Sequence, residues 1–251
     1  ASERGAMEDF IKEKTTLYHT QDPLGQRIEV CEGCYNEERM RLLLVDGAMQ
    51  SAQYLEPALA GELPFEYMRE FSWIYRLKPD IERVLLIGGG GFAYPKYFLQ
   101  HYPEKSIDVI ELSPTIVDIA RDYFGLRALE KAYPDRLRVL VGDGHAYLKT
   151  MAEPSHLPYD AILNDAYIGY KSSASMQASA ELFHRCLTSD GIYAANMVTA
   201  LRGLRSIHMR RERKHFQKVF EHTFLMQCDE EIDPFVPQNN IFFASDAPFE
   251  M

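Results

Sequence analysis

Four consecutive glycines end an apolar run near the middle of the chain. The run "VLLIGGGG" occupies residues 84–91, and a helix-like stretch follows it. Gly88, Gly90 and Ala93 fit the spacing G-x-G-x-x-A, which between a strand and a helix lets a phosphate or a nucleoside approach the main chain closely. We therefore expect Gly88, Gly89 and Gly90 to form a ligand-binding loop. The alternative is a tight turn without a ligand.

Three acidic residues follow later strand-like runs in the same way. Glu111 ends "SIDVIEL", about twenty residues beyond the glycines, where a carboxylate can accept hydrogen bonds from two ribose hydroxyls. Asp143 and Gly144, in "GDG", are placed to meet an adenine amino group, unless Asp143 only caps the next helix. Asp165, in "NDAYIGY", is expected to orient an amine nucleophile or take its proton, with a helix cap as the alternative. This order of glycine loop, ribose acid, adenine acid and cleft acid is that of transferases with a nucleoside sulfonium donor.

The elements that must position these residues alternate between strand and helix from residue 81 onward. Such alternation predicts a mostly parallel, doubly wound sheet, and "TFLMQC" with "NNIFFASD" predicts an antiparallel hairpin at its end. Before them, "QRIEVCEG" and "MRLLLVDGAMQSAQYL" predict a small antiparallel sheet. We thus expect an α/β protein, with a small N-terminal β domain over residues 1–63 and a Rossmann-like nucleoside-binding domain over residues 64–251.

Composition excludes several classes of partner. A net charge of −10 argues against a sequence-independent nucleic-acid binder. No apolar stretch approaches the roughly 18 residues of a membrane span, and the N-terminus does not read as a signal peptide, so we expect a cytoplasmic enzyme. The cysteines of "CEGC" (31–34) are expected in a turn and lack a second ligand pair, so no metal site is expected. The basic run "MRRERKH" (209–215) is expected to be a solvated helix face.

From about residue 24 to about residue 245 the chain resembles the spermidine synthase family. The resemblance implies a small β domain joined to an AdoMet-type Rossmann domain, and a homodimer. "LLLVDGAMQ" is similar to the family's L-D-G-x-x-Q, which implies that Gln50 lies at the nucleoside site. "PFEYMRE" is similar to the segment whose tyrosine contacts substrate or donor, which would be Tyr67. "YDAILNDAYIG" lies over the catalytic Y-D-x-I-x-x-D-S-S-D-P, with Asp165 as its first acid.

Two acids of the family pattern are absent. The glycine-loop acid, which in aminopropyltransferases helps hold the amino end of decarboxylated S-adenosylmethionine (AdoMet), is replaced by Gly91. The second catalytic-segment acid, which holds the polyamine, falls at Ile168. Each lost charge-assisted hydrogen bond costs about 1.5–3 kcal/mol of binding. We therefore expect nucleoside binding to be kept and amine recognition to be weakened.

The first hypothesis is a transferase that binds AdoMet or a related adenosyl sulfonium and moves an alkyl group, most simply methyl, to a small-molecule acceptor. Asp165 would act on the nucleophile, and Tyr67 and Tyr167 would contact the substrate. The second is a true aminopropyltransferase using decarboxylated AdoMet and putrescine or a related amine, with acids such as Glu66, Glu70 or Asp143 compensating for the lost ones. The third is a non-catalytic nucleoside-binding protein. None of them calls for a metal, a nucleic acid or a membrane.

Overall fold

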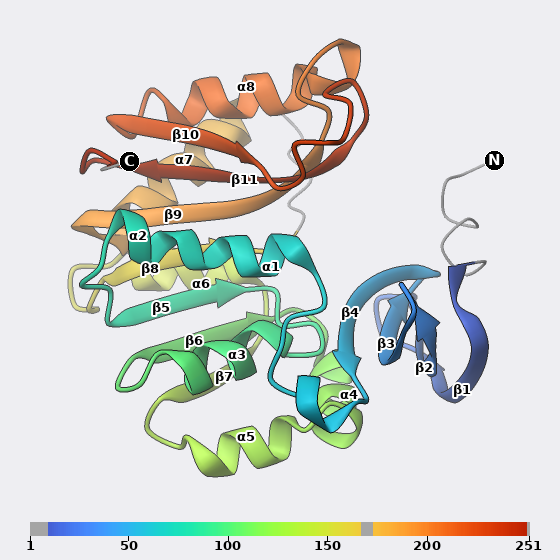
Figure 1. Cartoon of the computed structure of the whole chain (residues 1–251). Helices are drawn as coiled ribbons and strands as arrows, with labels where there is room; N and C mark the ends of the chain where they lie inside the picture. The colour runs from blue at the N-terminus through green and yellow to red at the C-terminus, as the bar shows by residue number, and fades with distance from the viewer. Residues whose placement is uncertain (1–9, 167–172, 250–251) are drawn as a thin grey trace. The chain divides into compact units, whose positions relative to one another are not determined.

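The computed structural model describes residues 10–166 and 173–249, and it has the expected α/β architecture (Figure 1). A four-stranded antiparallel sheet comes first, in the order β1 (Lys12–Gln21), β2 (Arg27–Tyr35), β3 (Glu38–Val45) and β4 (Ala48–Tyr54). β3 turns into β4 at Asp46 and Gly47, both with positive φ, which is the geometry that an Asp-Gly hairpin turn requires. The small N-terminal antiparallel sheet is confirmed.

The larger sheet has seven strands in the order β10-β11-β9-β8-β5-β6-β7. Their bounds are β5 (Arg83–Ile87), β6 (Ser106–Glu111), β7 (Leu137–Val141), β8 (Tyr159–Asn164), β9 (Leu187–Thr199), β10 (His222–Gln227) and β11 (Gln238–Ser245). β5 runs parallel to β6 and β8, and β8 parallel to β9, whereas β10 and β11 pair antiparallel. The predicted mostly parallel sheet with a C-terminal hairpin is therefore confirmed.

Helices fill most of the connections. They are α1 (Glu66–Glu70), α2 (Ile74–Leu77), α3 (Ala93–His101), α4 (Pro114–Tyr123), α5 (Leu126–Ala132), α6 (Gly144–Met151), α7 (Ser173–Cys186) and α8 (Ile207–Phe216), with short 3₁₀ turns η3 (Pro57–Leu59), η4 (Phe71–Trp73) and η5 (Leu204–Ser206). The strand β1 and the helix α5 were not predicted. The chain enters β9 directly after α7, because Leu187 already pairs with Tyr159, so the predicted helix through "LTSDG" was too long.

The chain divides into two compact units, one of residues 1–65, 89–104 and 111–142, the other of residues 66–88, 105–110 and 143–251. The domain boundary expected between residues 63 and 64 remains a prediction.

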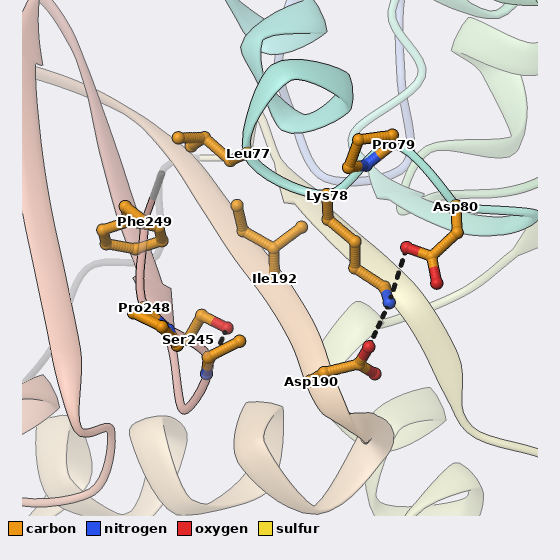
Figure 2. A pocket seen from close by; sticks show the side chains of 10 residues that line it. Leu77, Lys78, Pro79, Asp80, Asp190, Ile192, Ser245, Pro248 and Phe249 are labelled. Carbon is orange, nitrogen blue, oxygen red and sulfur yellow. Dashed lines mark hydrogen bonds and ion pairs between the residues drawn. The ribbon is translucent and has the colours of Figure 1, made fainter. Parts of the chain in front are cut away.

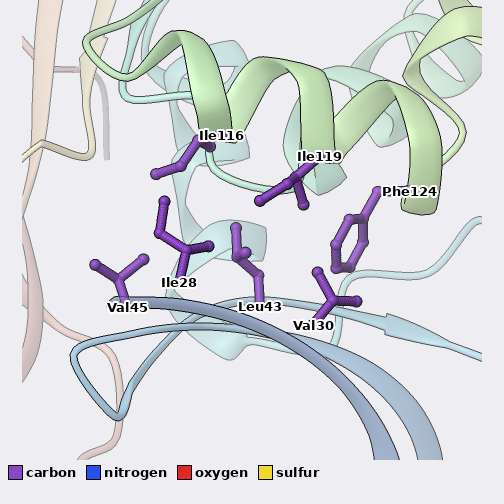
Figure 3. Packing of buried hydrophobic residues seen from close by; sticks show 7 residues of the cluster. All are labelled: Ile28, Val30, Leu43, Val45, Ile116, Ile119 and Phe124. Carbon is purple, nitrogen blue, oxygen red and sulfur yellow. The ribbon is translucent and has the colours of Figure 1, made fainter. Parts of the chain in front are cut away.

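In the first unit, one face of the small sheet packs on α4 (Figure 3). Every second residue of a strand points to the same face, so Ile28 and Val30 of β2 and Leu43 and Val45 of β3 share one face, which meets the apolar residues three apart on α4. The cluster consists of Ile28, Val30, Leu43, Val45, Ile116, Ile119 and Phe124, all buried. Burial of each such side chain stabilises the fold by about 1.5–3 kcal/mol.

The "CEGC" segment lies inside β2, so its expected place in a turn was wrong. Cys31 is buried, and a Cβ added at Gly33 would stand 2.5 Å from Ile11 Cγ2, so the glycine allows close packing instead of a turn. Among the described residues, no group of three or more metal-ligating side chains converges. Within the same residues, no helix is long and apolar enough to cross a bilayer.

In the second unit, a buried lysine fixes the end of α2 to the start of β9 (Figure 2). Lys78 Nζ donates to Asp190 Oδ2 at 2.5 Å and to Asp80 Oδ1 at 3.1 Å. Burial alone would lower the pKa of Lys78, but the two carboxylates raise it above its ordinary value. The ion pairs border a cavity of about 260 Å³ whose apolar wall includes Ile192 and Phe249.

Candidate active site

In the first unit, the glycine loop is held by the carboxylate that follows β6. Glu111 Oε2 accepts hydrogen bonds from Gly89 N at 2.9 Å and Gly90 N at 3.2 Å, and Oε1 accepts one from Ser113 N at 3.0 Å. Glu111 is buried, so these backbone donors fix its position. A carboxylate offers about four lone-pair sites, and three are used here. The predicted contact of Glu111 with ribose hydroxyls remains a prediction.

No side chain fits at Gly91. A Cβ added there would lie 2.6 Å from Ser51 Oγ and 2.9 Å from Ser51 Cβ, both shorter than real Cβ contacts. Ser51 Oγ itself is buried and has no hydrogen-bond partner among the described residues. Ser51 on β4 therefore occupies the space that the family's glycine-loop acid would need.

Gln50 lies beside the same loop. A Cβ added at Gly90 would stand 3.6 Å from Gln50 O, while the Gln50 side chain is exposed. Gly90 has φ +50, a conformation that glycine adopts without strain. The main chain of β4 thus lies close to the loop, and the predicted contact of Gln50 with a nucleoside remains a prediction.

In the second unit, the end of β5 approaches the residue that follows β8. Gly88 has φ +94, and a Cβ there would stand 3.1 Å from Ala166 N. Asp165 N donates to Ile87 O at 2.9 Å. The close approach therefore fixes the main chain at Asp165.

Both carboxylate oxygens of Asp165 are held by side chains. Tyr67 Oη donates to Oδ2 at 3.1 Å, and Asn196 Nδ2 donates to Oδ1 at 3.2 Å. Burial raises the pKa of Asp165 to about 7, although the two hydrogen bonds lower it. Burial and the charge of Asp165 also raise the pKa of Tyr67, so Tyr67 stays a hydrogen-bond donor at neutral pH. A carboxylate that titrates near pH 7 is suited to exchange protons with an acceptor amine.

Sequence reasoning missed Asn196. It lies in β9, within "GIYAANMV", and the available signal was a polar residue in an otherwise apolar strand. Next to it, Asn164 Nδ2 donates to Tyr193 Oη at 3.0 Å, and Asn164 Oδ1 accepts from Ala166 N at 3.2 Å. Asn164 and Asn196 both line a cavity of about 160 Å³ that extends toward α8.

Asp143 caps α6. Its Oδ1 accepts a hydrogen bond from Ala146 N at 2.7 Å, which is the structural alternative left open by the sequence. A Cβ at Gly144 would lie 2.8 Å from Ile87 Cγ2, so packing against β5 requires a residue without a side chain. The predicted contact of Asp143 and Gly144 with adenine remains a prediction.

Four other positions were singled out in the sequence. Tyr167 and Ile168 lie outside the described residues. Glu70 is half-buried on α1, and burial raises its pKa, whereas Glu66 is exposed. In the described part of the chain, the hydrogen bonds to Asp165 come from Tyr67 and Asn196 and not from these acids.

Comparison with known proteins gives consistent matches. The family model of the spermine/spermidine synthase domain matches residues 74–243. A polyamine aminopropyltransferase from Vibrio vulnificus is 29% identical over 189 residues, 73% of this chain and 60% of that protein. The mouse eEF1A lysine and N-terminal methyltransferase is 32% identical over 82 residues, 33% of this chain and 11% of that protein. This chain therefore spans less than two thirds of the length of either relative.

Among solved structures, a probable spermidine synthase from Corynebacterium glutamicum has the same fold. It superposes with a TM-score of 0.70 at 22% identity, covering 94% of this chain and 81% of that one. The coverage includes the small antiparallel sheet as well as the larger sheet.

Proposed function

Because this chain belongs to the spermine/spermidine synthase family, we propose that it is a transferase that binds AdoMet or a related adenosyl sulfonium and alkylates, most simply methylates, an amine. The observations that carry this proposal are the contact of Gly91 with Ser51 in the first unit and, separately, the retained Asp165 in the second. In this proposal Glu111 and Asp165 keep the nucleoside-binding and proton-accepting roles, while Ser51 fills the space that the acid binding a decarboxylated donor would need.

The residues of the glycine loop fit the nucleoside part of such a donor. Glu111 has a lone-pair site left for a ribose hydroxyl, and Gly90 leaves the main chain open to close approach. The bound donor would supply an electrophilic carbon on its sulfonium. In this proposal Ser51 Oγ is a neutral donor and acceptor near the loop, which suits a zwitterionic amino acid end better than a purely cationic one.

The second group of residues would act on the acceptor. In this proposal Asp165 Oδ2 or Oδ1 takes a proton from the attacking amine, and Tyr67 and Asn196 hold the carboxylate in one orientation. A pKa of about 7 keeps a large fraction of Asp165 ionised at neutral pH and still lets it hold the proton after transfer. Tyr167 remains a predicted substrate contact. The homodimer and the cytoplasmic location also remain predictions.

Aminopropyl transfer is the second candidate. The relative from Vibrio vulnificus, whose name gives that activity, matches 73% of this chain. Acids such as Glu70 would then have to replace the function of the two lost positions. The filled space at Gly91 favours the first proposal.

The donor preference tests the proposal directly. Changing Ser51→Gly together with Gly91→Asp makes room for the family's acid and adds one charge-assisted hydrogen bond to a cationic donor. We expect the double variant to bind decarboxylated AdoMet about tenfold to a hundredfold more tightly than the parent, with little gain for AdoMet. Calorimetric titration of both donors measures this.

The single variant Ser51→Gly is the matched control, because it makes the space without the charge. If the double variant gains nothing over this control, the loop does not face the amino end of the donor.

A further inference from the structure

The outer face of α8 carries one continuous stripe of exposed side chains. From Ile207, residues Arg210, Arg211 and Lys214 follow at spacings of three, four and seven, and all are exposed. Leu204, one turn before Ile207, is 85% exposed. The stripe therefore begins apolar and continues basic.

The charge of this region is opposite to that of the whole protein. Residues 201–216 contain six Arg or Lys and one Glu, a formal charge of +5 in a chain of net charge −10. Five of the six cations, Arg202, Arg205, Arg210, Arg211 and Lys214, are exposed. Within residues 10–166 and 173–249, none of these five forms an ion pair with a carboxylate, so the charge is left for a partner.

Further apolar side chains lie next to the stripe. Leu201 N and Arg202 N donate to Pro234 O at 2.8 and 2.9 Å, which ties the start of this segment to the connection between β10 and β11. A Cβ at Gly203 would lie 3.1 Å from Phe235 Cδ1. Phe235 and its neighbour Val236 are each about half exposed (57% and 48%). We call Leu204, Ile207, Phe235, Val236 and the five exposed cations the α8 surface.

One cavity is lined both by a residue of the α8 surface, Arg205, and by Asn196, which contacts Asp165. The cavity has a volume of about 160 Å³, and its lining includes Arg205, His208 and Glu212 as well as Asn164 and Asn196. Asn196 donates directly to Asp165. The uncharged side-chain amides of Asn164 and Asn196 suit hydrogen bonds to the peptide groups of a bound main chain.

We propose that the α8 surface docks an acidic polypeptide segment with large apolar side chains, so that the acceptor amine belongs to a protein instead of a free small molecule. This proposal rests on the proposed function. The apolar residues would anchor the segment, and the cations would select acidic sequences and speed its association.

An extended polyanion would fit the α8 surface less well than a short acidic peptide. The connection that carries Phe235 also carries Asp229, Glu230, Glu231 and Asp233, and the chain as a whole is acidic. RNA or an anionic membrane would meet these carboxylates together with the basic stripe, which is unfavourable. A short peptide can meet the stripe alone.

A random peptide library displayed on phage, selected on the immobilised full chain without any donor, tests the proposal. We expect enriched peptides to combine Asp or Glu with large apolar residues. Two double variants are then compared with the parent by fluorescence anisotropy of the best peptide: Leu204→Ser with Phe235→Ser, and Arg210→Glu with Arg211→Glu. Each should bind the peptide more than about tenfold more weakly. Binding should also weaken with added salt.

Lys149→Glu with Leu157→Ser is the matched control, because both residues are exposed outside the α8 surface, and it should bind like the parent. Failure to enrich any peptide, enrichment of basic peptides, or equal binding by the surface variants would overturn the proposal. Preferential binding of single-stranded RNA or of phosphatidylserine vesicles would also overturn it. Because no donor is used, docking and donor binding succeed or fail independently.

Discussion

At the scale of single residues, the account depends on Asp165 and on Gly91. The sequence predicted both positions, because each falls in a motif with fixed spacing after a strand. It could not predict Asn196 or Ser51, since Asn196 meets Asp165 from 31 residues away and Ser51 meets Gly91 across two elements. Contacts of this kind depend on tertiary structure and leave no local pattern.

The raised pKa of Asp165 predicts a specific pH dependence of stability. The folded protein binds the Asp165 proton more tightly than the unfolded chain, whose carboxyl titrates near 3.8. The free energy of unfolding should therefore fall as pH rises from about 4 to about 7, and the loss is complete above pH 7. Asp165→Asn should remove this part of the slope and leave the protein at least as stable at pH 8, as measured by urea unfolding at several pH values.

Asp135→Asn, at an exposed carboxylate, is the control and should keep the parent slope. The same slope in Asp165→Asn and in the parent would show that Asp165 titrates normally, and the proton-accepting role would then lose its support.

At the scale of elements, apolar periodicity and turn chemistry predicted most of the fold. The Asp-Gly turn between β3 and β4, the Ser113 cap of α4 and the β10–β11 hairpin follow from local sequence. The strand β1 was missed because it is exposed along nearly all of its length and shows no apolar alternation. The helix α5 was missed because seven residues give too little periodicity to recognise.

The contact of the small sheet with α4 supplies the element-scale prediction. Leu43 is fully buried at the centre of this cluster, so Leu43→Ala removes packed methyl groups and leaves a cavity. We expect the free energy of unfolding to fall by about 2–5 kcal/mol. Chemical denaturation measures this free energy. The control is Leu157→Ala at a leucine that is 76% exposed, which should change the free energy of unfolding by less than about 0.5 kcal/mol. A loss for Leu43→Ala as small as that of the control would mean that the sheet does not pack on α4.

At the scale of the whole molecule, charge is distributed in a way that composition hides. The net charge of −10 argued against a sequence-independent nucleic-acid binder, yet residues 201–216 carry +5. The basic run was expected to be a solvated face, and its exposed stripe agrees with that expectation. Its position beside exposed apolar residues and a cavity leading to Asn196 could be seen only in the structure.

We propose that the chain keeps the nucleoside site of its family and binds a decarboxylated donor only weakly. Calorimetric titration of the unmodified protein with AdoMet and with decarboxylated AdoMet tests it most directly, alongside Glu111→Gln, which keeps one acceptor oxygen and removes the charge. The account predicts tighter binding of AdoMet, weakened about tenfold or more by Glu111→Gln. Tighter binding of decarboxylated AdoMet, or binding of neither donor, would contradict it.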